Sequence, residues 1–475
     1  MSLENEKIDR STWAILLTLS CLGLIAMYAE TMVLPAIPTF IVDFNMPYNT
    51  SFWILSSYMI AGAVATPIAG KLSDVYGRKK ILLIVLSIYS AGILAGGFAD
   101  SLPFMLVARA AQGIGISMFP IAFGIIREVL PEKKLAVGQS IFTATFPAGA
   151  TIGLLVGANL IQNFGWHSTF FTVFPIAIIL GLFILKFIHV GSLPKISEEK
   201  TSIDIKGSVF LAMTIISFLV GISYIENNTG QGLESLIFFA ITIVSLTVFI
   251  TIEKRTKFPL IDLQLLTNKI LFFGIMILLI VGLCTFMVYQ TIPIMIQSPQ
   301  PLGFGGTELT TATVQLPFMI IFLIGSITSG FALDKIGNKR LTAIGTIVST
   351  LGFFSLLLFH STDYMVTITL TIIAAGLSLA FIGGFNIVLV STPIQFAGIA
   401  LGMTLLLNLI GQSIGPSIAG MFQQMNRATI DGFSGSFPTP EAYNWIFLTA
   451  FVISLMSVIL AVALNRKVVA KTFLN

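Results

Sequence analysis

The chain has 475 residues, of which 56% are hydrophobic and 10% are charged, with a formal net charge of +4. This apolar content exceeds the roughly 45–50% typical of soluble domains, and the mean hydropathy is +0.97, so the composition excludes a soluble globular protein. Both cysteines, Cys21 and Cys284, lie in apolar runs, which excludes a disulfide framework.

Fourteen apolar runs, each about long enough to cross a bilayer, follow one another along the chain. A helix needs about 20 apolar residues to cross about 30 Å of hydrocarbon, because lipid offers the backbone no hydrogen-bond partner. The runs lack the alternation of the roughly 10-residue strands of a membrane β-barrel. We therefore expect an all-α polytopic membrane protein, with spans near 12–41, 51–72, 80–100, 103–127, 136–161, 167–190, 207–226, 233–252, 269–297, 307–333, 340–359, 363–390, 397–424 and 443–465.

The basic residues fall almost entirely in loops on one side of these spans. If the N-terminus is cytoplasmic, Arg109 lies inside a span and Arg427 in an outer loop, and the other 23 of the 25 lysines and arginines lie on the cytoplasmic side. Short loops rich in Lys and Arg stay in the cytoplasm. We expect a multi-pass protein of the cell (plasma) membrane with both termini cytoplasmic. We interpret the positive net charge as a consequence of this topology and not as a sign of nucleic-acid binding.

One helical unit occurs twice. The loop GKLSDVYGRKK, from Gly70, is repeated 260 residues later as GFALDKIGNKR, and GATIGLLVGA, from Gly149, is answered by GQSIGPSIAG, from Gly411. The repeat predicts two six-span halves, residues 1–200 and 269–475, with a two-helix insert and its linker at 201–268. Parallel six-span halves are a transporter architecture, in which the substrate site lies between the halves near the bilayer midplane.

These repeated motifs also carry a family resemblance. GKLSDVYGRKK resembles the loop between helices 2 and 3 of the major facilitator superfamily, and RAAQGIG, from Arg109, is similar to that superfamily's fourth-helix motif. IDIKG and EKRTKFPLIDLQLL, which flank the insert, resemble the fourteen-span drug:proton antiporter branch, as does SFWILSSYMIAGAVATPIAGKLSD. The resemblance covers nearly the whole chain. It implies the major facilitator fold and a secondary transporter, and it implies that contacts of the repeated loop hold the outward-facing state.

The repeated loop predicts a conformational latch. Gly77 supplies a permissive backbone for a tight turn, and Gly70 allows a neighbouring helix to approach closely. Asp74 can cap a helix N-terminus, and Arg78 can bind a carboxylate bidentately. The full set of latch candidates is Gly70, Asp74, Gly77 and Arg78, with Asp334 and Gly337 in the second copy. The alternative is that the charges only anchor the loop to the inner leaflet, which is how we interpret Lys79 and Lys80.

Two charges lie well inside predicted spans, away from the span ends: Glu30 and Arg109. An ionisable group at the bilayer centre costs at least about 2.5–3.5 kcal/mol and marks a functional site by default. Pro35 and Pro38 break the first helix beside Glu30, which suits a cavity wall. We interpret Glu30 as the proton carrier and cation-attracting site, and Arg109 as its coupling partner. The alternatives are a hydrated Glu30 outside the bilayer, and an Arg109 that anchors helices through carbonyl groups with Gln112 alongside.

The resemblance places the family's helix 1 acid two residues before a threonine, whereas Glu30 directly precedes Thr31. This one-residue shift rotates the direction of the Glu30 side chain about the helix axis by about 100° relative to the family's acid.

Glycines at four-residue spacing in the fifth span allow close backbone packing on one face. They are Gly149, Gly153 and Gly157, with Gly411, Gly415 and Pro416 as the counterparts in the second half. The family's antiporter motif has a proline and a glycine where this chain has Leu154 and Ala158. The glycines therefore fit either a degenerate antiporter motif or a plain packing face.

Aromatic and methionine side chains suit large lipophilic cations, through cation–π attraction and adaptable packing. The residues expected to face a central cavity are Tyr28, Thr31, Trp53, Tyr58, Gln112, Phe146, Met287, Tyr289 and Gln290. We predict an exporter of amphipathic or cationic drugs that works by alternating access. The alternatives are a lipid or glycolipid flippase, another small-metabolite exporter, or a non-transporting receptor; an enzyme is not expected.

The sequence contains no phosphate-binding loop of the form G-x-x-x-x-G-K-[ST], so we expect the proton gradient to supply the energy. No cofactor or metal is expected. The expected partners are small lipophilic or cationic substrates, protons and the lipid bilayer, and we expect a monomer.

Overall fold

The structure, a computed structural model, describes residues 9–131, 134–188, 204–224, 232–256, 259–261, 263–392, 397–433 and 435–466. Its described residues contain fourteen helices that are long and apolar enough to cross a membrane. This confirms the all-α membrane architecture expected from the apolar runs.

The first half runs from α1 to α9. Its elements are α1 (Arg10–Thr31), η1 (Leu34–Ala36), α2 (Ile37–Asp43), α3 (Tyr48–Ser51), α4 (Trp53–Tyr76), α5 (Arg78–Gly97), α6 (Leu102–Gly113), η2 (Ile114–Ser117), α7 (Met118–Val129), α8 (Leu135–Phe164) and α9 (His167–Phe187).

The insert and the second half complete the chain. The insert consists of α10 (Ile205–Tyr224) and α11 (Gly232–Arg255), and η4 (Leu265–Thr267) precedes the second half. The second half comprises α12 (Lys269–Gln297), α13 (Glu308–Ile336), α14 (Asn338–Leu358), α15 (Asp363–Val390), α16 (Ala397–Met425), the antiparallel strands β1 (Arg427–Thr429) and β2 (Ser436–Pro438), and α17 (Pro440–Arg466).

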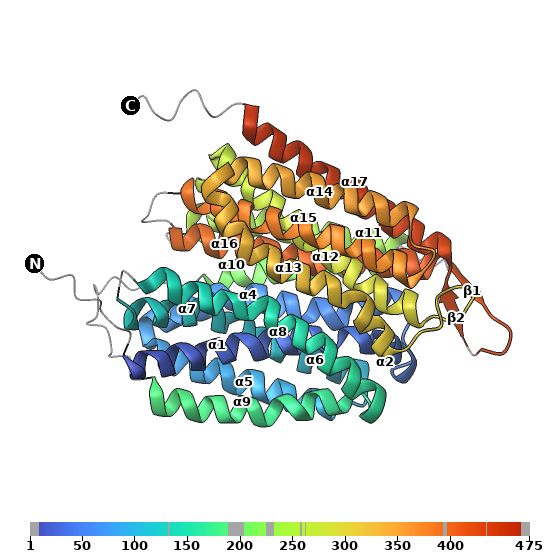
Figure 1. Cartoon of the computed structure of the whole chain (residues 1–475), viewed down its shortest axis with the longest axis horizontal. Helices are drawn as coiled ribbons and strands as arrows, with labels where there is room; N and C mark the ends of the chain where they lie inside the picture. The colour runs from blue at the N-terminus through green and yellow to red at the C-terminus, as the bar shows by residue number, and fades with distance from the viewer. Residues whose placement is uncertain are drawn as a thin grey trace, which may run out of the picture.

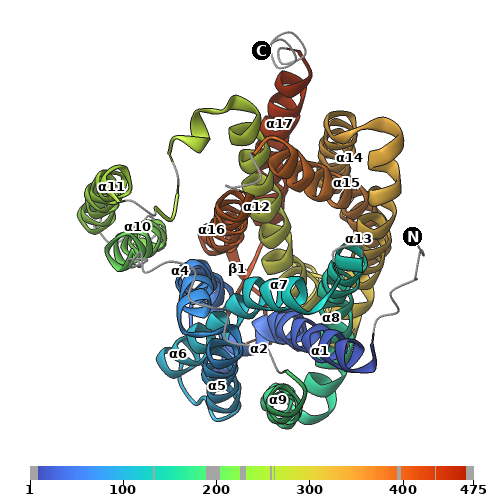
Figure 2. The ribbon, with the colours of Figure 1, turned by 90° about the vertical axis from the view of Figure 1, so that its left-hand side faces the viewer.

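The helices run roughly parallel to one long axis, with both chain ends at one end of the molecule and the β-hairpin at the other (Figure 1). We call the first end the terminal face and the second the distal face. Seen from the terminal face, α1–α9 form one group and α12–α17 another, and the pair α10–α11 stands at the side next to α4 (Figure 2). Of the two domain boundaries proposed from the sequence, the first lies outside the described residues and the second falls where α12 begins.

Two spans are interrupted. The first breaks between α1 and η1, where Pro35 and Pro38 interrupt the helix as expected, because proline lacks the backbone N–H that a helix requires. The fourth span passes through the 3₁₀ segment η2, which the sequence analysis did not predict. There, a Cβ added to Gly113 would lie 2.0 Å from the carbonyl oxygen of Tyr58, so the backbones of α6 and α4 touch.

Candidate functional site

Glu30 lies in the last turn of α1, directly before the break in the first span. Its side chain is half-buried. The carboxylate is close enough to Arg109, Tyr58 and Tyr289 to interact with them electrostatically, yet no hydrogen bond or ion pair joins it to another described residue. Because Tyr289 belongs to α12, Glu30 lies where the two halves meet.

Arg109 is fully buried in α6 and is held mainly by backbone carbonyl groups. Its Nε donates to the carbonyl of Ile54 at 3.1 Å, and its Nη1 donates to the carbonyl of Ala29 at 3.1 Å and to Oε1 of Gln112 at 2.8 Å. The Ala29 carbonyl belongs to the last turn of α1, where helix ends leave acceptors unpaired. The guanidinium carbon lies 4.5 Å from the centre of the Tyr58 ring.

This geometry matches the anchoring alternative for Arg109 and also keeps its positive charge beside Glu30. The remaining nitrogen, Nη2, is buried and has no hydrogen-bond partner among the described residues. Arg109 therefore fixes the broken end of α1 against α4 and α6, and it retains one free donor in the region of the carboxylate.

Further buried hydrogen bonds hold the same helices together. Tyr58 donates to the Ala26 carbonyl at 3.2 Å, and Tyr89 donates to the Ile25 carbonyl at 2.9 Å. Each phenol thereby ties a neighbouring helix to α1, close to the turn that carries Glu30.

On the second half, Tyr289 and Gln290 of α12 lie at the boundary with the first half. Tyr289 donates to Sδ of Met319 at 3.3 Å, and Gln290 donates through Nε2 to Oγ of Ser51 at 2.6 Å. Met287 is buried against α16, where a Cβ added to Gly415 would lie 2.8 Å from its backbone nitrogen.

The structure does not bring the other predicted cavity residues to Glu30. Tyr28 is hydrogen-bonded to Thr172 of α9, and Gln112 donates to the Gly92 carbonyl of α5 at 2.8 Å. Thr31 donates to the Ala150 carbonyl of α8 at 2.9 Å. These three side chains form hydrogen bonds between helices of the first half, and not across the boundary between the halves.

The two remaining aromatic candidates pack into apolar clusters. Trp53 stacks on Phe52 with 5.0 Å between ring centres, in the cluster that also contains residues of α10 and α16. Phe146 packs on Phe119 with 4.3 Å between ring centres. Both rings contact neighbouring aromatic rings, and their place in a central cavity stays a prediction.

The glycines of α8 lie against the backbone of α1. Added Cβ atoms at Gly149, Gly153 and Gly157 would come within 2.4 Å of the Leu24 carbonyl oxygen, 2.4 Å of Thr31 Oγ1 and 2.8 Å of Met32 Cα. In the second half, those at Gly411 and Gly415 would come within 2.2 Å of the carbonyl oxygens of Leu279 and Leu283, and Pro416 lies inside α16. No side chain fits at these crossings.

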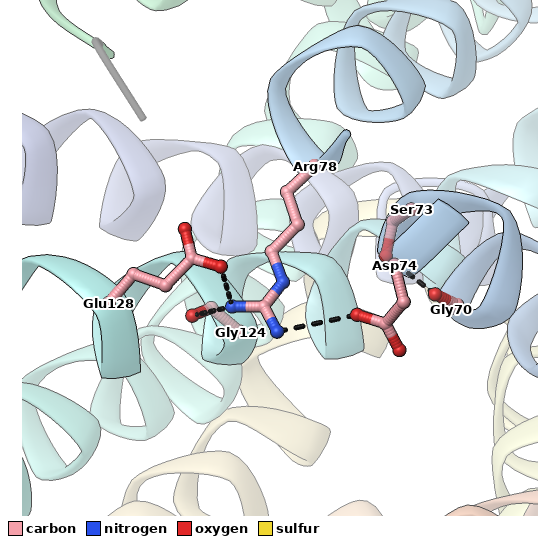
Figure 3. A network of polar contacts seen from close by, with 6 residues as sticks. All are labelled: Gly70, Ser73, Asp74, Arg78, Gly124 and Glu128. Carbon is pink, nitrogen blue, oxygen red and sulfur yellow. Dashed lines mark hydrogen bonds and ion pairs between the residues drawn. The ribbon is translucent and has the colours of Figure 1, made fainter. Parts of the chain in front are cut away.

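The loop between α4 and α5 contains a charged network centred on Arg78 (Figure 3). Its guanidinium pairs with Glu128 of α7 at 2.5 Å and with Asp74 at 3.3 Å, and it also donates to the Gly124 carbonyl. A Cβ on Gly124 would lie 2.7 Å from the guanidinium carbon, so a side chain at this position would displace the guanidinium. Glu128 was missed from the sequence, where Arg78 was expected to bind a carboxylate but this partner was not named.

The structure corrects two details of the predicted latch. A Cβ at Gly70 would meet nothing within 4 Å, so no helix approaches closely there. Asp74 does not cap α5, because the N-cap position is Gly77, with φ of 96° and no side-chain cap. Gly337 begins α14 in the same way, with φ of 78°. The side chain of Asp334 lies outside the described part of the structure.

Four hydrogen bonds join described residues of the two halves, and all lie in the distal half of the helices. Two of them start from α12: Gln290 donates to Ser51, and Gln297 donates to the Pro35 carbonyl at 2.8 Å. The others join the backbone N–H of Tyr48 to Gln424 at 3.1 Å and Ser56 to the Ser413 carbonyl at 2.7 Å. We call these four contacts the distal seam. None of them involves a charged group.

Comparison with known proteins identifies the fold. The family model of the Major Facilitator Superfamily matches residues 19–416 and, in a second match, 278–473. The chain belongs to this superfamily. It is 27% identical over 420 residues to Multidrug resistance protein 3 of Bacillus subtilis (strain 168), covering 86% of this chain and 79% of the relative.

A second relative is the Tetracenomycin C resistance and export protein of Streptomyces glaucescens. It is 24% identical over 415 residues, with 86% of this chain and 75% of the relative covered. Among solved structures, a D-xylose-proton symporter matches with a TM-score of 0.67 at 13% identity, covering 96% of this chain and 98% of the other. The nucleoside transporter NupG matches with a TM-score of 0.64 at 15% identity, covering 95% and 100%.

These matches confirm the resemblance read from the loop and helix motifs, and the fourteen spans fit the fourteen-span branch. The protein is a transporter and not an enzyme. Within the described residues, no group of three or more His, Cys, Asp or Glu side chains is placed to hold a metal ion.

Proposed function

We propose that the protein exports amphipathic or cationic drugs across the cell membrane in exchange for protons. The observation that carries the proposal is Glu30, a half-buried carboxylate at the junction of the halves that is unpaired among the described residues. A carboxylate in such a place binds either a proton or a cationic substrate, because each neutralises a charge that is costly to keep away from water.

Arg109 gives this exchange its electrostatic setting. Arginine does not lose its proton in proteins, so its charge persists throughout the cycle, and it lies within electrostatic range of Glu30. When Glu30 is ionised, Arg109 stabilises the anion. When Glu30 is protonated, the free Nη2 donor remains available to the same region. We assign Arg109 a positioning and charge-balancing role.

The distal seam supports alternating access. We propose that the terminal face is cytoplasmic, because it receives the loops that contain most lysines and arginines. The seam then closes the outer side, and the structure corresponds to an inward-facing state. Neutral hydrogen bonds suit a gate that must open repeatedly, since none leaves a buried unpaired charge when it breaks. We propose that the Arg78 network acts as a latch whose partners change between states.

The names of two relatives support a drug substrate: one is a multidrug resistance protein and another a resistance and export protein for tetracenomycin C. The half-buried carboxylate favours cationic compounds among such substrates. We further propose that the protein works as a monomer without a cofactor.

An efflux assay tests this function. The protein is expressed in a host that lacks its own efflux pumps, and ethidium, tetraphenylphosphonium and a neutral antibiotic are followed separately. We expect export of the two cations that stops when a protonophore collapses the proton gradient, and substrate-induced proton release from the purified protein. Export that persists with the protonophore, or no proton release with any exported cation, contradicts proton exchange.

A further inference from the structure

The insert α10–α11 has no role in the mechanism above. It stands beside α4 at the edge of the molecule, with α11 outermost (Figure 2). Helix α10 contacts α4 of the first half and α16 of the second. It therefore lies across the line where the two halves must move relative to each other.

The two sequence segments that flank the insert meet at its terminal-face end. Asp204, from IDIKG, accepts from the backbone N–H of Gly207 at 2.7 Å and so caps α10. Glu253, from EKRTKF, accepts from the backbone N–H of Ile261 at 3.1 Å. A Cβ on Gly207 would lie 2.4 Å from Oδ2 of Asp204 and 2.9 Å from Oε1 of Glu253, so the two carboxylates close around this glycine.

These carboxylates lie next to the first half. Both are buried, with 8% of Asp204 and 3% of Glu253 exposed. Lys71, in the last two turns of α4, is close enough to Asp204 for their opposite charges to attract. A buried negative charge is stabilised by such a neighbour, so electrostatic attraction acts between this end of α10 and α4.

The distal end of α10 is attached to the same half. The side chain of Asn49, in α3, donates to the backbone carbonyl of Ser223 at 3.1 Å. Asn49 is buried, with 5% exposed. Since α3 leads directly into α4, both ends of α10 have polar or electrostatic interactions with this one segment of the first half.

The contact of α10 with the second half is different in kind. Leu211, Ile215 and Leu219 recur every four residues along α10 and share an apolar cluster with Ala400, Met403 and Leu406 of α16. Asn49 thus gives α10 a hydrogen bond to the first half, whereas the contact of α10 with α16 is made through this apolar cluster. Apolar surfaces without directional bonds can shift past one another at low cost, as in the small sliding motions of packed helices.

We propose that the insert is clamped to the first half at both membrane faces and slides over α16 during transport. In this arrangement α10 moves with α4 and stays in contact with both α4 and α16 in both states. The clamp consists of Lys71 with Asp204 at the terminal face and Asn49 with Ser223 at the distal face.

Reversible cross-linking tests the proposal. In a background with Cys21→Ser and Cys284→Ala, one variant carries Asn49→Cys and Ser223→Cys, and a matched variant carries Leu211→Cys and Met403→Cys. Each is treated with a bifunctional thiol reagent whose spacer is cleaved by reductant. We expect the first cross-link to leave ethidium export intact, and the second to stop it until reductant is added. Single-cysteine variants treated in the same way control for modification alone.

If the first cross-link stops export and the second does not, the insert moves with the second half. If both cross-links stop export, or if neither does, the insert does not slide over one half only. Export by the untreated background tests the transport function separately. A second measurement does not need transport and compares two pairs of spin labels when Gln290→Ala weakens the distal seam. The distance between labels at Ile205 and Tyr76 should stay the same. The distance between labels at Ile205 and Val390 should change. A changed distance for the first pair with an unchanged second pair would overturn the proposal.

Discussion

The two halves share one architecture but differ in how they use polar groups. The first half places charges in and beside its spans: Arg109 is fully buried, Glu30 is half-buried, and the partly buried Arg78–Glu128 pair lies at helix ends. In the second half, from Ile270 to Asn465, charged residues occur only at helix ends and in connecting loops, and the buried polar side chains of the helix interiors include the amides Gln290, Gln315, Asn408 and Gln423.

The repeated loops show the same difference in one pair of positions. Arg78 and Asn338 occupy matching places, 260 residues apart. Arg78 lies over Gly124, whereas Asn338 donates to Oδ1 of Asn386 at 2.8 Å. Gly124 and Asn386 are 262 residues apart, the same offset as Gly149 and Gly411. A large side chain over a glycine in one half is thus replaced by two amides of intermediate size in the other.

This difference suggests a division of labour between the halves. A buried amide can exchange hydrogen-bond partners without the large cost of stranding a charge. The second half can therefore bind and release the distal seam as it moves. In the proposed mechanism the first half holds the groups whose charge changes or must be balanced, so proton exchange is expected to depend on that half alone.

The largest expected effect comes from removing the charge of Glu30. Glu30→Gln preserves shape and hydrogen bonding but fixes the neutral state, so we expect proton-driven export of cations to be lost while neutral compounds still bind. Glu30→Asp should keep part of the activity, because the carboxylate retreats by one methylene. Gln290→Ala, in the second half, should only lower the rate. Export and substrate-induced proton release are measured for all three.

If Glu30→Gln releases protons as the wild type does, the coupled proton lies elsewhere. If Gln290→Ala is as damaging as Glu30→Gln, the proposed division between the halves is wrong.

The next effect concerns Arg109 and is structural. Arg109→Met keeps an apolar stem but leaves the carbonyls of Ala29 and Ile54 and the amide oxygen of Gln112 without their donor. Each buried acceptor left unpaired costs about 1–3 kcal/mol, so we expect much less folded protein in the membrane. Thermal unfolding in detergent measures the loss. Normal yield and melting temperature would show that Arg109 is not the anchor its contacts indicate.

Much of this architecture could be predicted from the sequence, because membrane spans depend on run length and on the placement of Lys and Arg. The break at Pro35 and Pro38 was predicted because proline removes a backbone donor. The facing of Tyr28, Thr31 and Gln112 was not, since every span here is apolar on most sides and periodicity gives little indication of direction. The break at Ile114–Ser117 was missed because it depends on the contact of Gly113 with Tyr58, which involves another helix.

A smaller effect separates charge from packing in the Arg78 network. Arg78→Asn alone leaves Glu128 unpaired and an empty space over Gly124, so stability and transport should both fall. Adding Gly124→Asn recreates the amide pair of the second half. We expect the double variant to recover the melting temperature but not the export rate. Recovery of both would show that the charge of Arg78 is dispensable and that the network is not a latch.

The smallest effect is expected at the matching position of the second half. Asn338→Ala removes one partly buried, neutral hydrogen bond to Asn386, which contributes about 0.5–1.5 kcal/mol. Asn386 stays close to water at the terminal end of α15, so the cost of leaving it unpaired is small. We expect a slight decrease in melting temperature and an unchanged export rate, measured beside Arg78→Asn at equal protein levels. A loss of export as large as that of Arg78→Asn would mean that both loops act as latches, and that the charge difference between the halves does not decide which of them controls the transition.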